Sequence, residues 1–201
     1  MTKLRPDLAA IAEMIPASSS VLDVGCGMGD LLAYLQKEKQ VLGRGIELSQ
    51  QVVNECISRG LSVIQGDADI DLSYYPDSAY DFVVLSQTLQ TLQHPDEVLK
   101  ELVRIGKRAV VSVPNFGHWK NRFFLAFRGK MPVTKSLSYQ WYDTPNIHFC
   151  TISDFLILCK KLGLKVEKSV YTTESGAVSS IPSHPTVANL FVQNGIFLVA
   201  R

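Results

Sequence analysis

The 201-residue sequence lacks the features that would mark a membrane, secreted or strongly nucleic-acid-binding protein. No run of about 18 apolar residues is present, so we expect no transmembrane helix. The formal net charge is only +1, which argues against a general affinity for nucleic acid or for membrane surfaces. Charges interrupt the short apolar pattern of residues 1–16, which therefore predicts an amphipathic helix rather than a signal peptide.

Paired cysteines and clustered histidines are also absent. The four cysteines are Cys26, Cys56, Cys150 and Cys159. None of them forms a Cys-x-x-Cys pair, and without an export signal we interpret them as reduced thiols of a cytoplasmic protein. The four histidines are His94, His118, His148 and His184. Their scatter predicts no metal site.

Short apolar runs alternate with helical patterns along most of the chain. The predicted strands are Ser20–Val24, Val41–Glu47, Leu61–Gln65, Asp81–Leu85, Lys107–Val113, Leu164–Tyr171 and Gly195–Ala200. The predicted helices are Leu31–Lys37, Ser49–Arg59, a segment between Pro95 and Gly106, and Thr151–Leu162. This alternation predicts one α/β domain over residues 1–201, with a doubly wound, mostly parallel, Rossmann-like sheet of seven strands.

Two C-terminal stretches are less regular. Residues 172–186 are rich in Ser and Pro and predict a loop. Asn194 and Gly195 either begin the last strand or form a hairpin turn between Leu190–Gln193 and that strand.

The motif VLDVGCGMGD, residues 21–30, joins the first predicted strand to the first helix. Its three glycines permit positive φ and let a ligand approach the backbone closely. A dinucleotide-binding loop usually reads G-x-G-x-x-G, but Asp30 stands where the third glycine would fall. Asp23 would repel a pyrophosphate and attract a cation such as the amino group of an amino-acid moiety. We therefore expect S-adenosylmethionine or S-adenosylhomocysteine, with an NAD-dependent reductase as the weaker alternative.

Further polar residues follow the next strands at the edge where open α/β sheets bind ligands. Glu47 can accept two hydrogen bonds from a ribose diol, Leu48 can pack against adenine, and Asp67 can accept from the adenine amino group. The motif LSQTLQ, residues 85–90, follows the fourth strand. We predict a cofactor site formed by Asp23, Gly25, Cys26, Gly27, Gly29, Glu47, Leu48, Asp67, Ala68 and Ser86.

Several of these residues have a simpler interpretation when they are taken singly. A glycine triad is often only a tight turn, and Asp67 is more ordinary as a turn or cap residue. Cys26 is more ordinary as a small loop residue than as a nucleophile, because nothing nearby would activate its thiol. Asp23 has little structural reason to end a strand, and the ordered set of strand-end residues favours a ligand site.

At this level of detail the sequence resembles class I S-adenosylmethionine-dependent methyltransferases and, more closely, the methionine-biosynthesis MetW family. The stretches VLDVGCGMGDLL, LSQTLQ, SVPNFGHW, RGKMPVTK and WYDTPNIHFCTISDF, all between residues 21 and 155, carry the resemblance. It implies the class I methyltransferase fold and a role in methionine biosynthesis beside a homoserine O-acyltransferase. It assigns cofactor binding to Asp23, the three glycines, Glu47 and Asp67. It identifies no methyl acceptor and no catalytic residue.

Residues 115–150 interrupt the strand–helix alternation after the fifth strand. No acidic residue occurs from Leu102 to Tyr142. The cations of the segment are Lys120, Arg122, Arg128, Lys130 and Lys135, and its helically spaced aromatics are Phe116, Trp119, Phe123 and Phe127. This amphipathic segment fits a lid over the ligand, a docking face for a protein partner, a membrane-surface helix, or a helix whose aromatic face packs on the sheet. Among the functional interpretations we favour a lid that is also a docking face.

A second polar-aromatic cluster closes the insertion. Its members are Tyr139, Trp141, Tyr142, Asp143, Asn146 and His148. Such a cluster can bind a small polar acceptor, with His148 as a general base. A hydrogen-bonded loop histidine is the more ordinary interpretation of His148, and the same holds for His118.

Two functions follow as expectations. One is an S-adenosylmethionine-binding partner that regulates or activates a homoserine O-acyltransferase. The other is a methyltransferase acting on a small acceptor. An Asn/Asp-Pro-Pro-Tyr acceptor motif is absent after the fourth strand, where LSQT stands instead, and this favours the partner role. We expect neither nucleic-acid binding nor stable membrane insertion.

Overall fold

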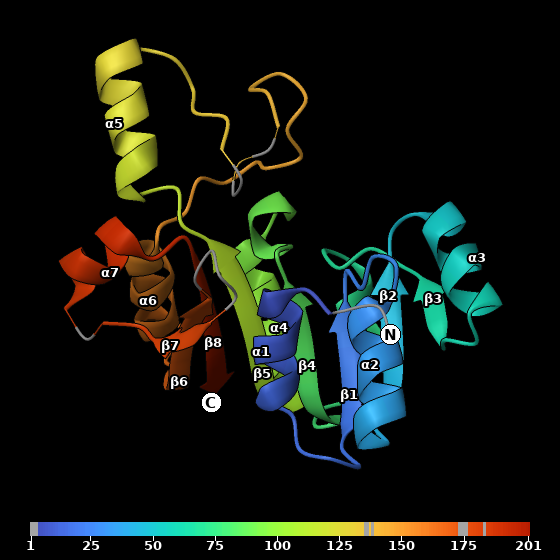
Figure 1. Cartoon of the computed structure of the whole chain (residues 1–201). Coiled ribbons are helices and arrows are strands. Elements are labelled where there is room, and N and C mark those ends of the chain that lie inside the picture. The colour runs from blue at the N-terminus through green and yellow to red at the C-terminus, as the bar shows by residue number, and fades with distance from the viewer. Residues whose placement is uncertain (1–3, 135–136, 138, 173–176, 183) are drawn as a thin grey trace.

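The computed structural model describes residues 4–134, 137, 139–172, 177–182 and 184–201, and contains one eight-stranded sheet (Figure 1). The strand order is β3-β2-β1-β4-β5-β8-β6-β7. The strands are β1 Ser20–Val24, β2 Leu42–Glu47, β3 Val63–Gln65, β4 Tyr80–Ser86, β5 Gly106–Pro114, β6 Lys165–Thr172, β7 Val178–Ser180 and β8 Asn194–Ala200. The first five are parallel, whereas β8 is antiparallel to both β5 and β6.

The doubly wound, mostly parallel sheet expected from the sequence is confirmed, with one additional short strand. Strand β7 lies in the stretch that predicts a loop and pairs with the end of β6, where Tyr171 faces Ser179. Residues 173–176 and 183 of that stretch lie outside the described residues. A three-residue strand leaves no period-2 pattern in a sequence, and it pairs here because β6 offers it an open edge.

The hairpin alternative at Asn194 and Gly195 is wrong. Asn194 is the first residue of β8 and pairs with Pro114, and the preceding segment is a helix rather than a strand. Gly195 serves close packing instead of a turn, because a Cβ at this position would lie 2.6 Å from the ring of Phe197 and 2.7 Å from Ile152 Cδ1.

Helices cover both faces of the sheet. They are α1 Pro6–Glu13, α2 Asp30–Lys39, α3 Gln50–Ser58, α4 Pro95–Ile105, α5 Trp119–Arg128, α6 Ile152–Lys161 and α7 Pro185–Phe191, with 3-10 turns η1 Asp71–Tyr74 and η2 Leu89–Thr91. Helices α1, α2 and α3 bury one face, and α4, α6 and α7 bury the other. Alternate strand residues supply the two cores, as Val84 and Val83 of β4 show.

Helix α5 stands clear of the sheet in Figure 1. Its one buried residue is Asn121, while Trp119, Phe123 and Phe127 are 43%, 57% and 74% exposed. The interpretation in which this aromatic face packs on the sheet is therefore wrong. Helical spacing alone cannot distinguish a core-facing stripe from a solvent-facing one, because the two have the same period.

The exit of β5 fixes the base of this insertion. Asn115 is buried, and its amide Nδ2 donates to the carbonyl oxygens of Asn189 and Val192 at 2.9 and 2.6 Å. Its Oδ1 accepts from the Gly117 N–H at 3.0 Å. His118 then caps α5, its Nδ1 accepting from the Lys120 N–H. The SVPNFGHW stretch thus positions the insertion.

No helix among the described residues is both long and apolar enough to span a membrane. The same residues contain no group of three or more His, Cys, Asp or Glu side chains that could hold a metal ion. All four cysteines are free thiols.

Candidate functional site

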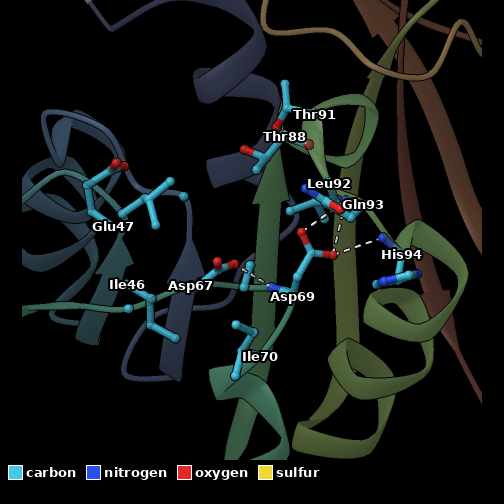
Figure 2. Close-up of a pocket in the computed structure, with 14 residues that line it drawn as sticks. Ile46, Glu47, Asp67, Asp69, Ile70, Thr88, Thr91, Leu92, Gln93 and His94 are labelled. Atoms are coloured by element: carbon cyan, nitrogen blue, oxygen red, sulfur yellow. Dashed lines mark hydrogen bonds between the residues drawn. The ribbon is translucent and has the colours of Figure 1, made fainter.

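A cavity of about 730 Å³ lies at the carboxyl ends of the parallel strands (Figure 2). We call it the strand-end cavity. It is lined by Gly25, Ile46, Glu47, Leu48, Gly66, Asp67, Ala68, Asp69, Ile70, Thr88, Thr91, Leu92, Gln93 and His94. Its position is the one at which open α/β sheets bind ligands, and its volume lies within the range of about 300–1,000 Å³ of small-molecule sites.

The glycine loop forms one end of this cavity. Gly27 adopts φ +51°, and a Cβ there would meet no atom within 4 Å, so the loop backbone faces open space at this position. Gly25 lies against the opposite wall, since a Cβ there would be 2.7 Å from Thr88 Oγ1. The loop can therefore bring backbone groups close to a ligand.

Gly29 has a different role from its two neighbours. It is the residue before α2 and has φ +71°, and a Cβ there would lie 2.4 Å from Leu61 Cδ1. It lets the start of α2 pack closely against the chain between α3 and β3, and it does not line the cavity. Gly29 can therefore act on a cofactor only indirectly, by setting the shape of the glycine loop.

Asp23 is the penultimate residue of β1, just before the glycine loop, and is only 2% exposed. Burial, followed by the negative charge of Glu47, raises the pKa of its carboxyl from 3.8 to about 7. An ionised carboxylate in this place has lost water and faces a second carboxylate. A cationic ligand group beside it would relieve both costs.

Glu47 links the end of β2 to the glycine loop. Its Oε2 accepts from the Gly27 N–H at 2.9 Å, and its Oε1 accepts from the Ser49 N–H at 3.2 Å. An ionised carboxylate offers about four lone-pair sites, so acceptor capacity remains for the hydroxyls of a ligand. Figure 2 places Glu47 across the cavity from Thr88 and Thr91.

Two aspartates after β3 organise the floor and the far wall. Asp67 Oδ1 accepts from the Asp69 N–H at 2.9 Å, which is the turn role that its residue type favours. Asp69 accepts from the backbone N–H groups of Gln93 and His94 at 2.9 Å each (Figure 2). Asp69 therefore fixes the chain before α4 as the wall of the cavity.

The LSQTLQ stretch supplies the remaining wall. Gln87 follows β4 with φ +55°, a conformation that a non-glycine residue rarely adopts. Its N–H donates to Ser112 Oγ at 3.0 Å, which holds the turn. Thr88 and Thr91, both in this turn, line the cavity. Strained backbone of this kind is concentrated at functional sites.

The structure brings part of the predicted cofactor set together. Gly25, Glu47, Leu48, Asp67 and Ala68 line the cavity. The other five members of the set, Asp23, Cys26, Gly27, Gly29 and Ser86, are not among its lining residues. The sequence analysis missed Asp69, Thr91, Gln93 and His94, because their positions depend on contacts between segments far apart in the chain. The available signal was the strand-end position of LSQTLQ and of GDAD, residues 66–69, which follows the third strand.

Cys26, His118 and His148 were the candidates for a reactive side chain, and each lies in a different environment. Burial, followed by the charge of Asp23, raises the pKa of the Cys26 thiol, so Cys26 is not an activated nucleophile. His118 is buried as the cap of α5. His148 is exposed and does not line the strand-end cavity. The structure thus gives no catalytic assignment.

Comparison with known proteins identifies the family. A profile described as "Methionine biosynthesis protein MetW" matches residues 5–199. The chain belongs to the MetW family. It is 34% identical over 177 residues to the "Bifunctional methionine biosynthesis protein MetXA/MetW" of Rhodopirellula baltica, a match that covers 84% of this chain. The chain spans only 28% of the length of that relative.

More distant similarities lie among methyltransferases. The chain is 27% identical over 187 residues to the demethylmenaquinone methyltransferase of Listeria welshimeri, covering 83% of this chain and 78% of that one. A solved S-adenosylmethionine-dependent methyltransferase from Mesorhizobium loti superposes with a TM-score of 0.71 at 15% identity, covering 98% of each chain. These similarities show that this MetW protein has the class I methyltransferase fold.

Proposed function

We propose that this MetW protein binds S-adenosylmethionine or S-adenosylhomocysteine in the strand-end cavity and acts in methionine biosynthesis as a regulatory or activating partner of a homoserine O-acyltransferase. The observation that carries the ligand proposal is the buried Asp23 just before an open glycine loop whose Gly27 N–H donates to Glu47. The observation that favours the partner is the bifunctional relative, in which MetXA and MetW share one polypeptide.

Each part of the ligand has a matching group. The amino group would pair with Asp23, and the ribose diol would donate to Glu47. The adenine would lie between the exposed apolar side chains of Leu48 and Ile70, which are 65% and 61% exposed in the cavity wall. The second oxygen of Asp67 would accept from the adenine amino group.

Methyl transfer to a small acceptor is the alternative function. Transfer from the sulfonium is an in-line displacement that needs mainly positioning, so it does not require a catalytic base. The fold is that of the methyltransferase relatives, which favours this alternative. A fold hosts many functions, however, and the site alone decides between them.

Calorimetric titration of the purified protein with S-adenosylmethionine, S-adenosylhomocysteine and NAD tests the ligand. We expect binding of either S-adenosyl compound and a higher melting temperature in its presence. The variant Glu47→Gln should bind at least about tenfold more weakly, because charge-assisted hydrogen bonds contribute roughly 1.5–3 kcal/mol each. The exposed Glu55→Gln is the matched control. Tight NAD binding without binding of either S-adenosyl compound would refute the assignment.

The partner role needs a separate measurement. We expect the protein to form a complex with the homoserine O-acyltransferase of the same organism, and the complex to acylate homoserine faster than the acyltransferase alone. Methyl transfer to an isolated acceptor, with no change in acyltransferase rate, would favour the alternative function.

A further inference from the structure

The insertion exposes six large aromatic side chains. The insertion surface is formed by Trp119, Phe123, Phe127, Trp141, Tyr142 and Phe149, which are between 43% and 74% exposed. Apolar side chains exposed together on a soluble protein are a feature of interaction sites. Helix α5 has 10 residues, and helices this short are marginal in water without tertiary packing. A further contact would therefore stabilise it.

A second cavity lies within the insertion, between residues that precede and follow α5 in the sequence. It has a volume of about 290 Å³ and is lined by Phe116, Met131, Pro132, Leu137, Trp141, Thr144, Asn146 and Phe149. We call it the insertion pocket. Its volume falls just below the range of about 300–1,000 Å³ typical of small-molecule sites. It fits one large side chain of a protein partner better than a whole metabolite.

The insertion pocket has a fixed rim. Phe116 and Phe149 meet edge to face, with ring centroids 4.9 Å apart. The backbone N–H groups of Ile147 and His148 both donate to the Gln90 carbonyl oxygen, at 2.9 and 3.0 Å. The Phe116 N–H donates to the Cys150 carbonyl at 3.1 Å. A rim that is already ordered loses little entropy when a partner binds.

Five of the six charged side chains in residues 115–150 are cations, and the sixth is Asp143. No acidic residue occurs from 102 to 142. Lys120, Arg122, Arg128 and Lys130 are exposed, and Lys135 lies outside the described residues. Carboxylates on a partner would add favourable charge pairing with these cations, whereas a basic partner segment would be repelled by them. The complementary surface is therefore acidic around an apolar centre.

We propose that the insertion surface is the docking site for the acyltransferase, and that the insertion pocket receives a large apolar side chain flanked by carboxylates on that partner. This inference rests on the proposed function for the identity of the partner and specifies the surface that binds it. Interface energy concentrates in buried Trp, Tyr and Arg residues, which makes Trp141 the expected central residue.

Both tryptophans of the chain, Trp119 and Trp141, lie on the insertion surface, so labelling reports on it selectively. The protein labelled with 5-fluorotryptophan should give two ¹⁹F resonances, assigned by Trp119→Phe and Trp141→Phe. Adding unlabelled acyltransferase should shift and broaden the Trp141 resonance. Unperturbed resonances on formation of a complex would overturn the proposal.

Affinity measurements with the full chain locate the contact. We expect Trp141→Ala to weaken acyltransferase binding at least about tenfold, and Arg128→Glu with Lys130→Glu to slow association most at low salt. The matched controls are Tyr74→Ala, an exposed aromatic residue elsewhere, and Lys100→Glu with Lys168→Glu. Melting curves confirm that each variant folds, and a second apolar variant, Phe123→Ala, replaces any that does not.

The possible outcomes separate the two proposals. Binding of acyltransferase that none of these variants weakens more than its control would overturn the docking site and leave the partner role intact. Failure of the wild-type protein to bind acyltransferase would overturn both the docking site and the partner role. The proposed binding of an S-adenosyl ligand would still be tested separately, by calorimetry. Self-association or binding to anionic vesicles that depends on Trp141, with acyltransferase binding unaffected, would also overturn the docking site.

Discussion

Replacement of Asp23 by Asn should raise the stability of the free protein and weaken its ligand binding. The carboxyl is 2% exposed, and burial together with Glu47 raises its pKa from 3.8 to about 7. Below a pH of about 4 the side chain is neutral in both the folded and the unfolded chain. Between about 4 and 7 only the unfolded chain loses the proton, so the free energy of unfolding falls as the pH rises through this window.

The size of the effect follows from the two pKa values. At about 1.36 kcal/mol per pH unit between them, the stability lost by pH 8 is about 4 kcal/mol, and less than about 2 kcal/mol is lost by pH 5. Local relaxation lowers these values, so we expect a gain of at least about 2 kcal/mol for Asp23→Asn at pH 8. For a protein of this size the melting temperature then rises by at least about 4 °C.

The assay is thermal unfolding of wild type and Asp23→Asn at several values between pH 5 and 8, with the exposed Asp143→Asn as a control. The difference between wild type and Asp23→Asn should widen as the pH rises. S-adenosylmethionine affinity of the same variant should fall, because the amide cannot pair with the ligand's amino group. Parallel stability curves, or a variant less stable than wild type at pH 8, would refute the reasoning.

Three other predictions concern the same region. The affinity of the wild-type protein for S-adenosylmethionine should increase from pH 6 to 8, because Asp23 releases its proton when the ligand binds. Calorimetry detects this release as a heat of binding that depends on the buffer. An affinity that does not change with pH would contradict the contact with Asp23. Gly27→Ala should lower the free energy of unfolding by only roughly 1–2 kcal/mol, the strain of a left-handed backbone, while it impairs ligand binding. Gly29→Ala should destabilise the fold more, because its Cβ would lie 2.4 Å from Leu61 Cδ1. Equal melting temperatures of the two variants would contradict this prediction. Amide hydrogen exchange at Ile147 and His148 should slow when ligand binds, because the Gln90 carbonyl that accepts from both lies in the same turn as Thr91 of the strand-end cavity. Unchanged exchange would show that the strand-end cavity and the insertion are independent.

The sequence predicts the strand ends well because parallel strands leave strong local patterns. DFVVL and AVVSV each have four apolar residues in five, as buried parallel strands do, and both lie in the centre of the sheet. Once these strands are placed, Gly25 and Glu47 must meet at one edge, and both line the cavity. Local pattern and topology together account for that half of the site.

The opposite half of the cavity depends on long-range contacts that leave no periodic pattern. Asp69 holds the backbone of Gln93 and His94 across 24 and 25 residues of sequence. A carboxylate that binds backbone N–H groups places no demand on the residue types of its partners. The wall at Gln93 and His94 was therefore outside the reach of sequence analysis, although GDAD marked one end of it.

The insertion shows a second kind of limit. Trp119, Phe123 and Phe127 predict a helix through their spacing, and α5 confirms it. The direction in which the helix faces is decided by Asn115, whose hydrogen bonds to Asn189 and Val192 fix the exit of β5. These partners lie 74 and 77 residues away along the chain, so no local pattern contains the information.

The arrangement of the two proposed sites explains how one short turn can connect them. Turn η2 carries Thr91 into the wall of the strand-end cavity, and the carbonyl of its Gln90 holds Ile147 and His148 at the edge of the insertion. A ligand that orders this turn also orders the rim on which a partner would dock. Because coupling between two binding sites is reciprocal, a partner that orders the rim must strengthen ligand binding by the same factor. On the two proposals made above, the level of an S-adenosyl ligand would be reported to a bound enzyme without transfer of a methyl group.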